Sequence, residues 1–109
     1  MEAKTVREIH VPTRVRLWAQ HPNYIAVIKD EWDTKFLEKY VGKTVTLRIS
    51  GVYVTGTLIK VKHGKSHDLE MILPKRLKPM WEILRRRGIE HDAVVIIRLE
   101  DGNEEVVEP

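Results

Sequence analysis

The chain has 109 residues, 42% hydrophobic and 32% charged, with a formal net charge of +3, which fits one folded domain with one core and excludes a disordered polyelectrolyte. It contains no cysteine, so disulfides and thiolate metal sites are excluded and a reducing compartment is expected. Because the N-terminus MEAKTVREIH lacks the apolar stretch of a signal peptide, and no apolar run approaches about 18 residues, we expect a cytoplasmic single domain, residues 1–109, without membrane contact.

The first thirty residues predict three short strands. Thr5–Val11 alternates apolar and polar side chains, and Pro12 is expected to end this strand. Arg14–Trp18 and Tyr24–Ile28 are the next two candidates. From Asp30 the apolar period becomes helical, which predicts a short amphipathic helix ending at Gly42. Its apolar face would consist of Phe36, Leu37, Tyr40 and Val41.

A hairpin is the clearest local signal in the chain. Two β-branched runs, Thr44–Ile49 and Val52–Val61, flank Ser50-Gly51, a two-residue connection of hairpin type. If Ile49 pairs with Val52, the core face of the hairpin has Leu47 opposite Val54 and Val45 opposite Gly56. On the solvent face, Arg48 then lies opposite Tyr53. A glycine within a long strand tolerates a strong bend, so Gly56 predicts the bend of a small barrel.

The second half continues the mainly β pattern. Lys62–His67 is expected to be a polar loop around Gly64, and Asp68–Leu73 a strand closed by Pro74. Pro79 suits the first turn of a helix over residues 78–87, whose core stripe would be Leu77, Met80, Trp81 and Leu84. Ala93–Leu99 and Glu104–Val107 would pair across Asp101-Gly102. The predicted fold class is mainly β with two short helices (α+β), a small strongly bent barrel over residues 33–109 with extra N-terminal strands in residues 1–30.

Catalysis finds no support in the sequence. The chain carries no GxSxG, P-loop, HExxH or GxGxxG pattern. His63 and His67 are four residues apart, but they flank a glycine loop without an evident third ligand, so we interpret them as solvated loop residues. We therefore expect no enzyme activity, no cofactor and no metal. Side-chain amides are few, which is typical of thermophile proteins; they are Gln20, Asn23 and Asn103.

The basic charge is concentrated in the middle of the chain. Residues 62–88 carry 8 basic and 3 acidic side chains, whereas residues 89–109 carry 1 and 7. Cations cluster at residues 60–67 and again at 75–78, and we expect both clusters at one rim of the barrel, where phosphates are neutralised and nearby rings stack on bases. The triplet Arg85–Arg87 is explained by the helix dipole alone. The predicted nucleic-acid-binding residues are Arg48, Tyr53, Lys62, Lys65, His67, Lys75, Arg76 and Arg98.

Residues 33–109 resemble an Sm-like (LSm) domain. The similar segments are FLEKYVGKTVTLRISG, VYVTGTLIKV, HDLEMIL and AVVIIRLEDGNEEVVEP, with Gly51 and Gly56 spaced as in the first Sm motif and Arg98 and Gly102 in comparable places. The resemblance implies a bent Sm-like or OB-like barrel, a homo-oligomeric ring and RNA binding. The loop KHGKSHD departs from the family, since only His67 and Asp68 match its Asp and Asn, so uridine specificity is not implied.

Residues 57–109 also resemble a SpoVT/AbrB-like swapped-hairpin domain. This second likeness rests on four segments: TLIKV, a basic glycine loop, MILPKRL and HDAVVIIRLEDGNEEVVEP. It implies an intertwined DNA-binding dimer that regulates transcription through Lys65, Lys75, Arg76 and Lys78. We rank single-stranded nucleic acid first, with RNA slightly preferred over DNA, and the DNA-binding regulator second. A protein interaction module without a nucleic-acid role is the third hypothesis.

Overall fold

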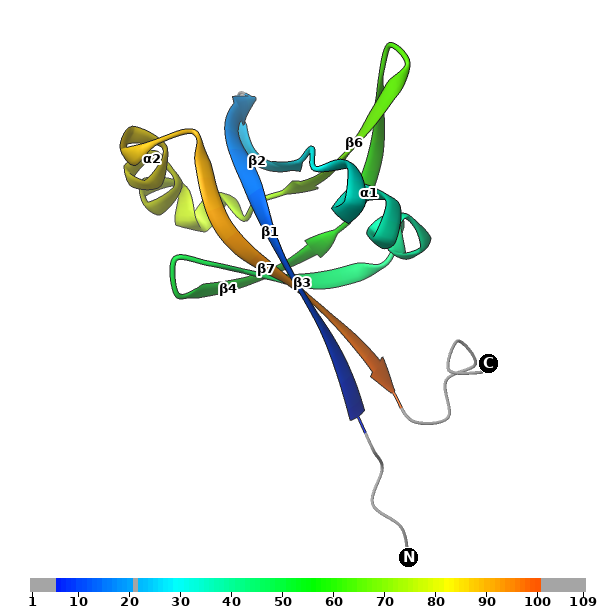
Figure 1. Cartoon of the computed structure of the whole chain (residues 1–109). Coiled ribbons are helices and arrows are strands. Elements are labelled where there is room, and N and C mark those ends of the chain that lie inside the picture. Colours follow the sequence, from blue (N-terminus) through cyan, green and yellow to red (C-terminus); the bar gives the residue numbers. More distant parts are fainter. Residues whose placement is uncertain (1–5, 21, 101–109) are drawn as a thin grey trace, which may run out of the picture.

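The protein is built on one antiparallel sheet, which the computed structural model describes over residues 6–20 and 22–100 (Figure 1). The elements are β1 (Val6–Gln20), β2 (Asn23–Ile28), α1 (Glu31–Leu37), η1 (Glu38–Tyr40), β3 (Thr44–Ile49), β4 (Val52–Thr57), β5 (Ile59–His63), β6 (Ser66–Ile72), η2 (Lys75–Leu77), α2 (Lys78–Arg87) and β7 (Glu90–Glu100). The strand order is β4-β3-β7-β1-β2-β6-β5. This confirms the predicted mainly β class with two short helices. No helix in the described part of the chain is long and apolar enough to cross a membrane.

A single residue joins the two edges of the sheet. β4 and β5 are the edge strands, and only Leu58 separates them in the chain. Leu58 is buried; its N–H donates to Lys43 O at 3.2 Å and its carbonyl accepts from Gly42 N at 2.8 Å. The chain therefore passes from one edge to the other at this point, which curls the sheet into a barrel-like shape (Figure 1). The run Val52–Val61, which we predicted as one strand bent at Gly56, is divided at Leu58 into β4 and β5.

The β3–β4 hairpin has the predicted register. Ile49 pairs with Val52, Leu47 with Val54 and Val45 with Gly56. Ser50 and Gly51 have φ values of 53° and 79°, as a two-residue turn with positive φ at both positions requires. All the apolar residues expected beneath this hairpin are buried; they are Val45, Leu47, Val54 and Leu58.

The N-terminal strands lie at the centre of the sheet. β1 pairs with β7 from Val6 to Arg16 and with β2 from Val15 onward, so the barrel is not confined to residues 33–109. The prediction that Pro12 ends a strand is wrong, because Pro12 lies inside β1 opposite Val94. β2 does not reach Pro12, so β1 has a strand partner on one side only at this point, and such a position accommodates proline.

The two helices each contribute buried residues to the core. Asp30 caps α1 by accepting a bond from Asp33 N at 3.0 Å, and Leu37 and Tyr40 are buried. Phe36, expected on the same buried face, is exposed instead. In α2, Trp81 and Leu84 are buried as predicted.

The segment predicted as a polar loop is a tight hairpin. His63 pairs with Ser66, and Lys62 with His67, across the two-residue turn Gly64-Lys65. This β5–β6 hairpin projects from the barrel (Figure 1). At the other end of the chain, Ala93–Leu99 is confirmed as part of β7. The turn expected at Asp101-Gly102 and the strand expected at 104–107 lie outside the described residues.

Candidate nucleic-acid interface

The predicted binding residues fall in four separate places. Lys62, Lys65 and His67 lie on the β5–β6 hairpin, Lys75 and Arg76 in η2, Arg48 and Tyr53 side by side on the β3–β4 hairpin, and Arg98 in β7. β6 separates the first two groups. Its seven residues span about 20 Å at a strand's rise per residue. The expectation that both basic clusters share one rim is therefore wrong.

A groove beside the β5–β6 hairpin is nearly neutral. It has a volume of about 580 Å³ and is lined by four lysines, including Lys29 and Lys60, and three carboxylates, including Glu38 and Asp68. Lys29 Nζ lies 2.9 Å from Asp68 Oδ2, and Lys60 donates to Glu38. The hydrogen bond and charge of Lys60 hold the pKa of Glu38 below its ordinary value. Half of the groove's cations are thus already paired.

The surface of η2 and α2 is far more basic. We call it the α2 basic surface; it consists of Lys75, Arg76, Lys78, Arg85, Arg86 and Arg87, all exposed. Among the described residues, none of the six forms an ion pair within 4.0 Å. The segment's one carboxylate, Glu82, accepts a long bond from Tyr24 at 3.4 Å. Burial raises the pKa of Tyr24, and Glu82 raises it further.

The local sequence forces these cations outward. Trp81 and Leu84 occupy the buried face of α2, and Trp81 Nε1 donates to Pro74 O at 2.9 Å, which fixes the helix start. The cations occupy positions outside this buried face, all of them exposed, and the helix dipole favours cations at the last turn. Our dipole explanation of Arg85–Arg87 did not foresee that they belong, with Lys75 and Arg76, to one segment of exposed cations without ion pairs to described residues.

An exposed indole directly follows the β1 residue that Arg85 of α2 contacts. Arg85 Nε donates to Leu17 O at 3.1 Å, and Trp18 directly follows Leu17 in β1. Trp18 is 42% exposed and forms one wall of a pocket of about 360 Å³. Sequence reasoning missed Trp18, because the contact of Arg85 with the neighbouring Leu17 joins residues 68 positions apart in the chain.

The three remaining predicted residues lie in two places with different surroundings. Arg48 and Tyr53 are both exposed and pair directly across the hairpin, so a cation stands beside an aromatic ring as expected. Arg98 Nε lies 3.6 Å from Glu8 Oε2, so the charge of Arg98 is partly neutralised.

Comparisons with known protein families, with curated proteins and with solved structures found no match. Function is therefore inferred from the chain's own residues.

Proposed function

We propose that the protein binds single-stranded nucleic acid, with RNA preferred over DNA, through the α2 basic surface and Trp18. One observation carries the proposal: six exposed cations gather within residues 75–87 without a single ion pair to a described carboxylate. Elsewhere five described lysines and arginines form ion pairs, among them Arg14 with Asp92 at 3.3 Å and Arg16 with Glu90 at 3.1 Å. A cluster left unneutralised suits a polyanion.

The chemistry of the surface suits a single strand. Guanidinium groups bind phosphate oxygens through two parallel hydrogen bonds, so the arginines of α2 can follow a backbone. Bases of a single strand stack on aromatic faces, and the exposed Trp18, which follows the Leu17 that Arg85 contacts, offers one. Lys62 and Lys65 on the projecting β5–β6 hairpin would contact the strand further along, and Arg48 with Tyr53 would form another stacking point.

The DNA-binding regulator remains the alternative, because Lys75, Arg76 and Lys78 would serve it from the same surface. It requires duplex preference and a two-fold dimer. A homo-oligomer, an Sm-like or AbrB-like relationship and a cytoplasmic location belong to this proposal as predictions. The absence of cysteine agrees with a reducing compartment.

Fluorescence anisotropy with labelled oligonucleotides tests the proposal. We expect single-stranded RNA to bind more tightly than single-stranded DNA and duplex DNA, with affinity falling between about 50 and 200 mM salt as counterions are released. No binding at the low salt would overturn the proposal. Tighter binding of the duplex would favour the regulator, and protein partners that survive nuclease treatment of an extract would favour the interaction module.

A further inference from the structure

Three metal-ligating side chains meet on one face of the β5–β6 hairpin. Asp68 and Glu70 alternate along β6 and therefore point to the same face, and the Gly64-Lys65 turn brings His63 back beside them. His63 Nε2 lies 3.3 Å from Asp68 Oδ2 and 3.8 Å from Glu70 Oε2. One ligand atom from each residue lies within 4.8 Å of the other two.

These spacings suit a metal ion. Zinc binds imidazole nitrogen and carboxylate oxygen at about 2.1 Å, and a tetrahedron of that radius has edges of about 3.4 Å. The two distances from His63 Nε2 bracket that edge length. Small side-chain rotations would place all three atoms on one ion, without any change in the backbone.

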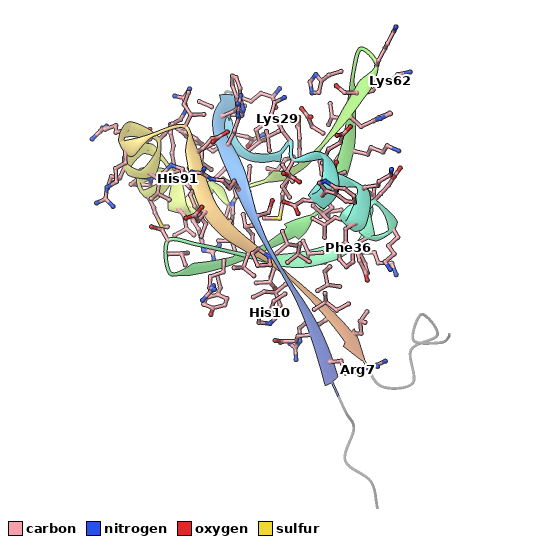
Figure 2. All side chains as sticks on the ribbon, viewed as in Figure 1. Arg7, His10, Lys29, Phe36, Lys62 and His91 are labelled. Carbon is pink, nitrogen blue, oxygen red and sulfur yellow. The ribbon has the colours of Figure 1, made fainter. Side chains whose placement is uncertain are left out.

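The burial and charge of the cluster also favour a cation. Asp68 is only 5% exposed and the Glu70 side chain 17%. Lys29, which Figure 2 labels, donates from Nζ to Asp68 at 2.9 Å and is the one lysine among the described residues that line the pocket beside Trp18. Two carboxylates thus face a single ammonium group, and burying such an excess charge is costly unless a further cation compensates it. Lys29 would keep the Asp68 carboxylate oriented, while the remaining lone pairs of that carboxylate bind the metal.

The cluster opens onto a pocket with an apolar floor. Besides the three ligands, the pocket of about 360 Å³ is lined by Trp18, Ile25 and Val27 among others. Three protein ligands leave a fourth position of a tetrahedral ion, and that position would face the pocket. Sites of this kind hold a water or a ligand oxygen at the fourth position.

We propose that His63, Asp68 and Glu70 form a binding site for Zn²⁺ or a similar divalent transition-metal ion. The imidazole ligand separates this site from the all-oxygen sites that Mg²⁺ and Ca²⁺ prefer. The site uses none of the cations of α2, but Trp18 lines its pocket and also belongs to the proposed nucleic-acid surface. Within the described residues, the other histidines belong to no such group; His91 Nε2, for example, lies 2.9 Å from Gly88 O.

Titration of the full chain with Co²⁺ and Zn²⁺ tests the proposal. We expect one equivalent of Co²⁺ to give visible absorption bands of low-symmetry coordination, and Zn²⁺ but not Mg²⁺ to abolish them. Calorimetry should give the same stoichiometry for Zn²⁺. Absence of a one-to-one complex, or displacement of Co²⁺ by an equal concentration of Mg²⁺, would overturn the proposal.

Matched histidine variants assign the site. His63→Ala removes an exposed ligand and leaves the core untouched, and His67→Ala changes the same hairpin outside the cluster. We expect His63→Ala and Glu70→Gln to weaken Zn²⁺ binding by at least about tenfold, because losing a ligand reduces metal affinity more than losing a residue that only hydrogen-bonds to a ligand. His67→Ala should bind Zn²⁺ as the wild type does. Circular dichroism confirms folding of each variant. Equal effects of His63→Ala and His67→Ala would refute the assignment.

Discussion

Replacing Gly56 with valine should destabilise the protein through a contact between β4 and β6. A Cβ at Gly56 would lie 2.6 Å from Met71 Cγ and 2.8 Å from Met71 Sδ, whereas carbon atoms ordinarily approach to about 3.5–4.0 Å. Met71 is 3% exposed and packs within the core, so it has little room to move. The glycine thus permits the close approach of the two strands.

The expected cost follows from this overlap. Overpacking a well-packed core costs about 1–3 kcal/mol, and valine adds two methyl groups beyond the clashing Cβ, so we expect about 3 kcal/mol. At about 4 °C per kcal/mol, the melting temperature should fall by about 12 °C. Thr57→Val, at an exposed position on the same strand, is the control and should change stability by less than about 0.5 kcal/mol.

Urea unfolding of both variants at one protein concentration measures these costs, and a double-mutant cycle identifies the cause. Met71→Ala removes the clashing Cγ and Sδ atoms, so Gly56→Val should cost at least about 1 kcal/mol less in that background. An equal cost with and without Met71 would refute the proposed contact, as would an unchanged unfolding midpoint.

Three further predictions concern α1 and its contacts. Thr13 is buried and donates to Asp33, so Thr13→Val should cost about 1.5–3 kcal/mol in chemical unfolding; a neutral result would contradict that bond. Asp30→Ala removes the helix cap and should cost about 1 kcal/mol, whereas Asp30→Asn should cost less. Lys60 lowers the pKa of Glu38. The ion pair between them therefore stabilises the folded state above the ordinary glutamate pKa of about 4.3, and this stabilisation is lost as pH falls through the lower pKa of the folded state. The melting temperatures of wild type and Lys60→Met should therefore differ at neutral pH and converge in acid; a constant difference would refute this.

The sequence allowed accurate predictions where local signals agree. The β3–β4 register follows from one apolar face and a two-residue turn, and both are visible in the residues from Thr44 to Thr57. Pro12 was misjudged because its tolerance depends on which side of β1 lacks a partner, a tertiary property. The strand break at Leu58 likewise depends on bonds to Gly42 and Lys43.

The candidate sites were less predictable than the fold. The polar composition of residues 62–67 resembles a loop, and this concealed the tight turn that sets His63 beside Asp68 and Glu70. A two-residue turn at Gly64-Lys65, combined with strand alternation, would have revealed that cluster. The contact of Arg85 with Leu17, the residue before Trp18, carries no local signal, because β1 and α2 are far apart in the chain.

Charge-matched variants test the central claim most directly. Arg86→Ala/Arg87→Ala removes two unpaired cations of the α2 basic surface, and Arg14→Ala/Arg16→Ala removes two cations that already pair with carboxylates. Anisotropy with single-stranded RNA, measured across a salt series, should show at least about tenfold weaker binding and a salt slope shallower by about 1.4 for the α2 variant, at about 0.7 per lost phosphate contact. The control should bind nearly as wild type. Equal losses in the two variants, or none in the α2 variant, would contradict nucleic-acid binding through this surface.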